Sequence, residues 1–151
     1  MENGIELVGL DELYAQSDII TLHCPLTEEN RHLINKESIA KMKKGVMFIN
    51  ISRGGLVDTQ ALIDGLKSRI ISSVGLDVYE EEENYFYEDF TDSILGDDTL
   101  LELLALPNVL VTSHQAYFTV EALEAIANTT LKNAADFDSG RELKNKVIKK
   151  R

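Results

Sequence analysis

The sequence predicts an α/β fold in which a parallel sheet is covered by helices on both faces. Two observations lead to this prediction. Short runs of continuous apolar, often β-branched residues recur along the chain, and such runs are typical of parallel strands buried on both faces. Between them lie segments whose apolar residues recur at helical spacing. Strands and helices that alternate in this way pack as layers around a parallel sheet.

The sequence of the first part of the chain, up to about residue 67, predicts three helices and two strands. Pro25 ends the first apolar run, Gly45 breaks the second helix, and either Asp58 or Thr59 can cap the third. In chain order the expected elements are a helix over 10–16, a strand over 18–23, a helix over 36–43, a strand over 46–51 and a helix over about 60–67.

The second part predicts two further strands and two helices. Pro107 stops the first of these helices, and Thr119 caps the last and longest one. Glu121 and Glu124 lie in the first turns of that last helix, where the helix dipole favours acidic side chains. The expected elements are a strand over 70–78, a helix over 100–106, a strand over 109–111 and a helix over 119–138.

Charge and composition exclude several classes of protein. The chain has 151 residues, enough for one domain, and a formal net charge of -11. Ten of the 26 acidic residues lie between Asp77 and Asp98, where there is no Lys or Arg, so the rest of the chain is close to neutral. A basic face for nucleic acid is therefore not expected. No apolar run approaches the roughly 18 residues of a membrane span, so no membrane association is expected either.

The single cysteine and the N-terminus indicate a cytoplasmic protein. Cys24 has no second cysteine to pair with, which suits a reducing compartment. Its sequence neighbours offer nothing to lower the pKa of a thiol, so we interpret Cys24 as a small packed residue rather than a nucleophile. Residues 1–4 carry an acid and no base, unlike a secretory signal.

Polar side chains follow each predicted strand, where ligands of parallel sheets bind. They are His23-Cys24-Pro25, the stretch Asn50–Gly55 around Arg53, Asp77 with the glutamates after it, and Thr112-Ser113-His114. Arginine presents a bidentate fork to a carboxylate, and histidine can exchange a proton with a hydroxyl or carbonyl. A neighbouring glutamate would orient the histidine ring. The glycines after Arg53 suggest a close approach of a ligand to the backbone. Together these residues predict a site for a small carboxylic acid.

Four stretches, in this order and spacing, resemble the D-isomer-specific 2-hydroxyacid dehydrogenases, and most of all their NAD-dependent D-lactate dehydrogenase branch. They are DIITLHCPLTEENRHLIN, MKKGVMFINISRGGLVD, VGLDVYEEE and LPNVLVTSHQAYFT. The resemblance extends over about residues 5–148. It implies an NAD-dependent oxidoreductase that reduces a small 2-keto acid, such as pyruvate, to a 2-hydroxy acid.

The resemblance also implies roles for individual residues. Arg53 would bind the substrate carboxylate, His114 would be the general acid/base, and Glu82 would pair with His114. The run of four glutamates leaves Glu80, Glu81 and Glu83 as competing partners for His114. Tyr117 falls at the family's aromatic substrate-pocket position. The cofactor-binding residues would be His23, Cys24, Pro25, Asn50, Ile51, Ser52 and Asp77.

One departure from the family pattern concerns the phosphates of the cofactor. None of the nine glycines is spaced as G-x-G, so the G-x-G-x-x-G turn that cradles a pyrophosphate is not found in this sequence. The resemblance thus assigns residues 1–118 to a partial NAD-binding Rossmann domain, the second half of the dinucleotide-binding domain. It assigns 119–151 to the crossover helix and tail of a substrate domain. We expect a truncated chain with weak or no activity of its own, or alternatively a non-catalytic remnant or an assembly partner of a full-length dehydrogenase.

Further expectations concern the acidic run, His32 and assembly. The segment 84–98 resembles the acidic, aromatic loop of the lactate branch. Side chains of consecutive glutamates diverge, so we interpret 80–98 as a solvated loop and expect no metal site. His32 lies among polar residues and is expected to be solvated. Unpaired sheet edges favour a homo-oligomer or a swapped assembly.

Overall fold

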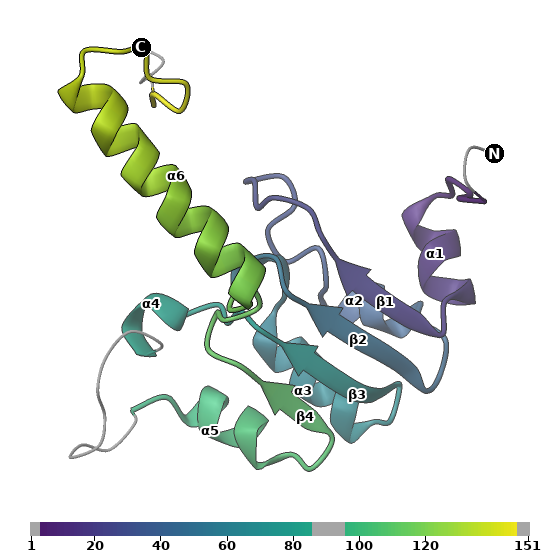
Figure 1. Cartoon of the computed structure of the whole chain (residues 1–151). Coiled ribbons are helices and arrows are strands. Elements are labelled where there is room, and N and C mark those ends of the chain that lie inside the picture. Colours follow the sequence, from purple (N-terminus) through teal and green to yellow (C-terminus); the bar gives the residue numbers. More distant parts are fainter. Residues whose placement is uncertain (1–3, 86–95, 148–151) are drawn as a thin grey trace. The chain divides into compact units, whose positions relative to one another are not determined.

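The computed structural model describes residues 4–85 and 96–147, and the chain divides into two compact units (Figure 1). The first unit ends at His114 and the second begins at Gln115. Each unit is described by itself.

The first unit alternates helices and strands. Its segment 86–95, which holds most of the expected acidic, aromatic loop, lies outside the described residues. The elements are α1 (Leu10–Gln16), β1 (Ile19–Leu22), α2 (Lys36–Ala40), β2 (Val46–Asn50), a 3₁₀ helix η1 (Gly54–Leu56), α3 (Thr59–Lys67), β3 (Ile71–Leu76), α4 (Glu82–Tyr85), α5 (Asp98–Ala105) and β4 (Val109–Val111).

All four strands are parallel and pair in the order β1-β2-β3-β4 (Figure 1). One row of paired residues crosses the whole sheet: Ile20 opposite Phe48, Phe48 opposite Val74, and Val74 opposite Val109. The first three of these side chains are buried. Parallel pairing brings the carboxyl ends of the four strands to one edge, so the residues that follow the strands gather there.

Helices α2 and α3 lie on one face of the sheet (Figure 1). Leu62, Ile63 and Leu66 of α3 pack into the core with the row described above. Asp58 caps α3, because its side chain accepts a hydrogen bond from the Ala61 N–H at 3.0 Å. Apolar burial between this helix layer and the sheet is the main force that holds the first unit together.

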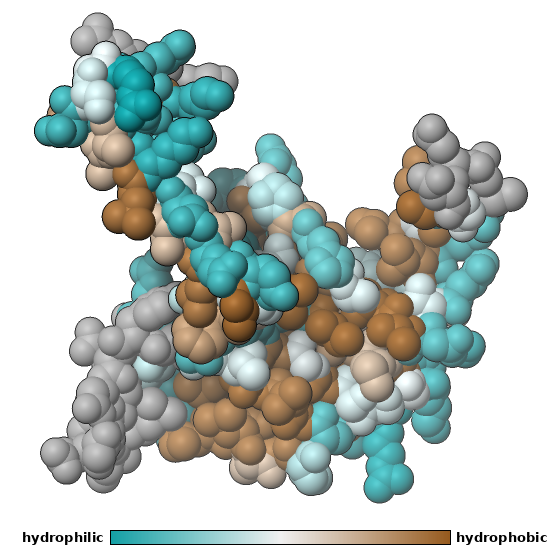
Figure 2. Space-filling view, in the orientation of Figure 1, coloured by the Kyte–Doolittle hydropathy of each residue, from teal (hydrophilic) through white to brown (hydrophobic). Residues whose placement is uncertain are grey.

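Within the described residues of the first unit, side chains on the opposite face of the sheet are exposed. Ile19, Met47 and Leu110 point to this face and are 57%, 40% and 68% exposed. Figure 2 shows apolar side chains gathered over the sheet on the side turned to the viewer. Helices were expected on both faces, but within the first unit β1 and β2 alternate buried and more exposed positions, as strands of a sheet covered on one side do.

The second unit is built around α6 (Val120–Asp138). The Thr119 hydroxyl accepts a hydrogen bond from the Ala122 N–H at 3.2 Å, which makes Thr119 the cap that the sequence predicted. Near the other end, the Arg141 guanidinium pairs with the Asp136 carboxylate at 3.0 Å. Neither α6 nor any other helix in the described ranges has the length and apolarity needed to cross a membrane.

The predicted elements all occur, with shifts at their ends. The predicted helix over 36–43 ends at Ala40, because the residues after it turn toward Gly45. The predicted helix over 100–106 starts two residues earlier, at Asp98, because the Asp97 carboxylate accepts a hydrogen bond from the Leu100 N–H at 2.9 Å and caps it.

Candidate functional site

The end of β2 is shaped by the side chain of Asn50, which is fully buried. Its amide Nδ2 donates to the Arg53 carbonyl oxygen at 2.9 Å, and its Oδ1 accepts from the Ser52 N–H at 3.0 Å. Both bonds close short loops, so they fold the backbone of 50–53 into a turn. The Ser52 hydroxyl donates to the Cys24 carbonyl oxygen and ties this turn to the end of β1.

Arg53 stands on this turn with an exposed side chain. Its Nη1 donates to the Ser52 carbonyl oxygen at 2.7 Å. Gly54 follows, and its backbone packs closely against the segment after β3. A Cβ at this position would overlap the Tyr79 carbonyl and lie 2.5 Å from the Glu80 nitrogen. Only glycine therefore lets the arginine turn pack against the backbone of residues 79 and 80.

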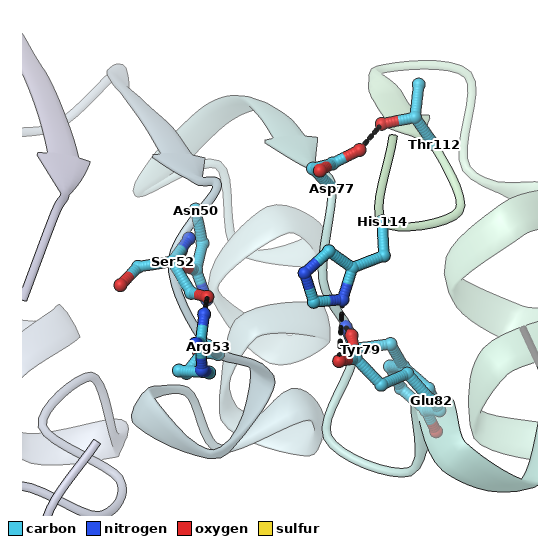
Figure 3. A network of polar contacts seen from close by, with 8 residues as sticks. All are labelled: Asn50, Ser52, Arg53, Asp77, Tyr79, Glu82, Thr112 and His114. Atoms are coloured by element: carbon cyan, nitrogen blue, oxygen red, sulfur yellow. Dashed lines mark hydrogen bonds and ion pairs between the residues drawn. The ribbon is translucent and has the colours of Figure 1, made fainter. Parts of the chain in front are cut away.

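His114 follows β4 and points toward the segment after β3. Its backbone has a φ of 53°, in the left-handed region, and its N–H donates to the Asp77 carbonyl oxygen at 2.7 Å. Its Nδ1 lies 2.9 Å from Glu82 Oε1 (Figure 3). The side chain of Glu82 is 14% exposed and that of His114 is 32% exposed. Of the four competing glutamates, the structure brings Glu82 to His114.

The pairing with Glu82 fixes how the imidazole can act. An ionised carboxylate only accepts hydrogen bonds, so Nδ1 carries the hydrogen in this contact. The second nitrogen, Nε2, lies on the ring edge turned to the side of Ser52 and Arg53 in Figure 3. Glu82 itself is held, since its Oε2 accepts from the Tyr79 N–H at 3.0 Å. The arrangement can orient a histidine for proton transfer through Nε2.

Asp77 and Thr112 connect the ends of β3 and β4. Asp77 is 3% exposed, and its Oδ1 accepts a hydrogen bond from the Thr112 hydroxyl (Figure 3). The Thr112 N–H donates to the Leu76 carbonyl oxygen at 2.8 Å, which extends the pairing of the two strands. A buried carboxylate with such a partner stays oriented at the strand ends.

The other residues predicted to bind a cofactor lie around the same edge. The His23 ring contacts the Thr21 hydroxyl, and the Pro25 carbonyl accepts from Asn30 Nδ2 at 2.8 Å. Ile51 is 44% exposed, and Cys24 is a free cysteine of intermediate exposure. The structure thus gathers His23, Cys24, Pro25, Asn50, Ile51, Ser52 and Asp77 at the carboxyl ends of neighbouring strands.

Tyr117 belongs to the second unit. It is 52% exposed, and its ring meets that of Phe118 edge to face, with 6.3 Å between the centroids. Its role in a substrate pocket stays a prediction.

His32 was expected to be solvated, and this expectation was wrong. Its Nε2 lies 2.5 Å from Glu80 Oε1, and the Arg31 guanidinium lies 3.9 Å from the same oxygen. The two partners are 48 residues apart in the chain, so no sequence spacing could indicate their pairing. With Glu80 bound by His32 and Glu82 by His114, the glutamate run is divided between two histidines.

A pocket of about 300 Å³ opens beside Arg53. Its walls include Leu26, Arg31, Arg53, Gly54, Tyr79 and Glu82. In the described parts of the chain, no group of three or more His, Cys, Asp or Glu side chains could hold a metal ion.

Tyr79 stabilises the segment that carries the glutamates. Its hydroxyl donates to Asp97 Oδ2 at 2.7 Å, and the residue is 5% exposed. Burial raises the pKa of Tyr79 above that of a free tyrosine, and the hydrogen bond to Asp97 adds to the effect. Tyr79 therefore stays neutral and keeps donating to Asp97 well into the alkaline range.

A parallel α/β sheet with an arginine turn and a histidine–glutamate pair at its carboxyl edge is typical of a dinucleotide-binding domain. Residues 1–116 match the model of the D-isomer specific 2-hydroxyacid dehydrogenase, NAD binding domain. The chain therefore belongs to this family.

Individual relatives are similar over nearly the whole chain. 2-Hydroxyacid dehydrogenase A of Aspergillus oryzae is 53% identical over 95% of this chain. Among solved structures, the pyruvate reductase of Chlamydomonas reinhardtii covers 91% of it with 53% identity and a TM-score of 0.85. D-lactate dehydrogenase from Aquifex aeolicus, solved with NAD and lactic acid, covers 88% with 41% identity and a TM-score of 0.77. This chain spans only 42%, 43% and 40% of these proteins, respectively.

Proposed function

We propose that this chain supplies the substrate-binding arginine and the acid/base pair of an NAD-dependent D-2-hydroxyacid dehydrogenase. The reaction is the reduction of a small 2-keto acid, such as pyruvate, by NADH. The observation that supports the proposal most directly is the 2.9 Å contact between His114 and Glu82 at the same sheet edge as Arg53. The family model and the relatives named above agree with this chemistry.

Arg53 is proposed to bind the carboxylate of the keto acid. Its exposed guanidinium beside the pocket can form two parallel hydrogen bonds with a carboxylate. Gly54 lets the backbone after Arg53 pack against residues 79 and 80, while the Arg53 side chain stays exposed. A substrate held by its carboxylate is oriented before the reaction begins.

His114 is proposed to give a proton to the carbonyl oxygen of the substrate. Glu82 holds the hydrogen on Nδ1, so the proton leaves from Nε2 of the imidazolium. NADH, when bound, would supply a hydride for C2, and with the proton from His114 the keto acid would become the hydroxy acid. In the reverse direction, neutral His114 takes the hydroxyl proton at Nε2. Glu82 stabilises the charged ring in both directions.

The polar residues at the strand ends fit the nicotinamide end of NAD better than its pyrophosphate. His23, Asn50, Ser52 and Asp77 offer polar contacts at the strand ends, whereas no G-x-G pair in the sequence can cradle a pyrophosphate. We propose that residues 1–118 act as part of an NAD-binding domain and that 119–151 belong to a crossover helix and tail. The 151-residue polypeptide by itself should bind NAD weakly and turn over slowly, because the remote part of a cofactor contributes to positioning its reactive ring.

The proposal is tested by binding and by turnover. NMR titration of the 151-residue chain with oxamate, a non-reactive analogue of pyruvate, should shift the signals of the arginine turn, and Arg53→Gln should abolish the shift. Arg141→Gln, in the second unit, is the matched control and should leave it unchanged. Oxamate binding that survives Arg53→Gln would contradict the proposed role. Tight NAD binding with rapid pyruvate turnover would contradict the expected weakness of this polypeptide.

A second candidate function is that of a non-catalytic assembly partner. The open sheet face with Ile19, Met47 and Leu110 favours it, because exposed apolar side chains on a sheet promote association. Light scattering distinguishes the cases: a homo-oligomer or a swapped assembly supports association, and a monomer at high concentration contradicts it.

A further inference from the structure

We propose that His32 is a positioning residue that holds Glu82 against His114 by binding Glu80. The inference deepens the proposed function and rests on it for its catalytic meaning. Its structural claim is separate: the contact between His114 and Glu82 depends on a histidine that touches neither of them.

The backbone of His32 is fixed in an unusual conformation. Its φ is 53°, in the left-handed region that few residues other than glycine and asparagine adopt readily. The His32 N–H donates to the Gly55 carbonyl oxygen at 2.9 Å, and its own carbonyl accepts from Asn35 Nδ2 at 2.9 Å. Bonds on both sides thus hold the residue next to the arginine turn, so its side chain starts from a fixed point.

The imidazole of His32 reaches the segment after β3. Its Nε2 lies 2.5 Å from Glu80 Oε1, in a contact where the Glu80 side chain is 22% exposed and that of His32 is 39% exposed. A carboxylate accepts, so Nε2 is the donor. Arg31 adds a positive charge 3.9 Å from the same oxygen. Two groups of the loop before α2 therefore attract one carboxylate.

Glu80 and Glu82 are mechanically linked through Tyr79. The Tyr79 N–H donates to Glu82 Oε2 at 3.0 Å, and the Glu82 N–H donates to the Tyr79 carbonyl oxygen at 3.2 Å. These two bonds close residues 79–82 into one turn. When Glu80 moves, the turn that carries Glu82 moves with it.

Two other contacts hold the Tyr79 end of this turn. The Tyr79 hydroxyl binds Asp97, and the Tyr79 backbone packs on Gly54. Without His32, the turn could pivot about Tyr79, and the Glu82 carboxylate would leave His114. In this proposal, the pair His32–Glu80 opposes this rotation.

The experiment follows the Nδ1–H proton of His114 by NMR of the 151-residue chain. The chain contains three histidines, so labelling them with ¹⁵N gives few imidazole signals. The hydrogen-bonded Nδ1–H of His114 should be visible in the wild type and absent in Glu82→Ala.

Two substitutions of His32 distinguish the effect of side-chain length from the effect of backbone conformation. Asparagine tolerates the left-handed conformation but is too short to reach Glu80, whereas glutamine can reach it. We expect the His114 Nδ1–H signal to be lost in His32→Asn and retained in His32→Gln. Glu80→Ala should also lose it, and the matched control Glu29→Ala, a carboxylate of the same loop bound by the Thr27 hydroxyl, should retain it.

Two results would overturn the proposal. One is a signal that persists in both His32→Asn and Glu80→Ala. The other is a signal that is lost equally in His32→Asn and His32→Gln but persists in Glu80→Ala, which would assign the effect to the loop backbone. Glu80 has no left-handed φ, so Glu80→Ala remains decisive should a His32 variant fail to fold.

The proposed function can fail independently. Suppose that the His114 Nδ1–H signal behaves as expected but Arg53→Gln leaves oxamate binding unchanged. The positioning role of His32 is then supported, and the assignment of Arg53 to the substrate site is contradicted.

Discussion

The turn after β2 and the turn after β3 meet in one site, but they are stabilised in different ways. The side chain of Asn50 organises the β2 turn through bonds to residues two and three positions away. Local bonds between Tyr79 and Glu82 close the turn after β3, but its glutamates pair with residues far along the chain: Glu80 with His32, 48 positions away, and Glu82 with His114, 32 positions away. The comparison teaches that local structure positions Arg53, whereas tertiary structure positions the His114–Glu82 pair.

The largest effect is expected where the two turns touch. Gly54→Ala places a Cβ against the backbone of Tyr79 and Glu80, which cannot yield as a flexible side chain can. The free energy of unfolding should fall by about 3 kcal/mol or more. Urea denaturation measures it. Gly9→Ala is the control, because nothing lies within 4 Å of a Cβ at Gly9. Equal free energies of unfolding for Gly54→Ala and Gly9→Ala would show that the turns after β2 and β3 can separate without a loss of stability.

The next effect concerns the local turn alone. Asn50→Ala removes two hydrogen bonds from a fully buried position and should cost about 2–4 kcal/mol. Asn108→Ala removes one exposed bond, to the Ser72 carbonyl, and should cost less than about 1 kcal/mol. Denaturation of both variants gives the difference. A cost for Asn50→Ala no larger than that for Asn108→Ala would refute the local organisation of the β2 turn.

The third effect concerns the tertiary turn and depends on pH. Tyr79→Phe removes the bond to Asp97 and should cost about 1–2 kcal/mol at neutral pH. Because the pKa of Tyr79 is raised in the folded state by burial first and by Asp97 second, its contribution is complete below about pH 10. As pH rises further, the unfolded chain loses its tyrosine proton first, and stability falls.

Thermal denaturation from neutral to alkaline pH measures this dependence. Tyr79→Phe should lose less stability above about pH 10 than the wild type. A part of the alkaline loss should remain, because burial also raises the pKa of Tyr14. Identical alkaline slopes for the variant and the wild type would contradict the argument.

The smallest effect is expected far from both turns. Lys41 pairs with Asp11 at 2.7 Å on the surface, where the two side chains are 51% and 76% exposed, and the hydrogen bond to Asp11 raises the pKa of Lys41. Water and salt screen such pairs. Lys41→Met should leave the urea midpoint unchanged in 0.15 M salt. A measurable drop there would mean that exposed pairs matter to this fold.

The same contrast explains what could be predicted from the sequence. The alternation of apolar runs and helical patterns predicted every described strand, and the caps of α3 and α6 were among the predicted positions, because periodicity and caps are local properties. The resemblance pointed to Arg53, Glu82 and His114, and the structure brings Glu82 and His114 into contact. The pairing of His32 with Glu80 was missed, since it depends on two loops that meet only in the folded chain. The open sheet face was missed because buried and half-buried strands have similar sequences.

The long separation of these pairs also bears on the order of folding. Forming a contact between residues 48 positions apart requires closing a long loop, which costs conformational entropy. The contact becomes favourable only after the strands between its partners are paired. The turn of Asn50 can form early, whereas the two histidine–glutamate pairs must form late. In hydrogen exchange, the turn after β3 should then open more readily than β2 and β3 themselves. We therefore expect this chain to be folded by most spectroscopic measures before the His114–Glu82 contact forms.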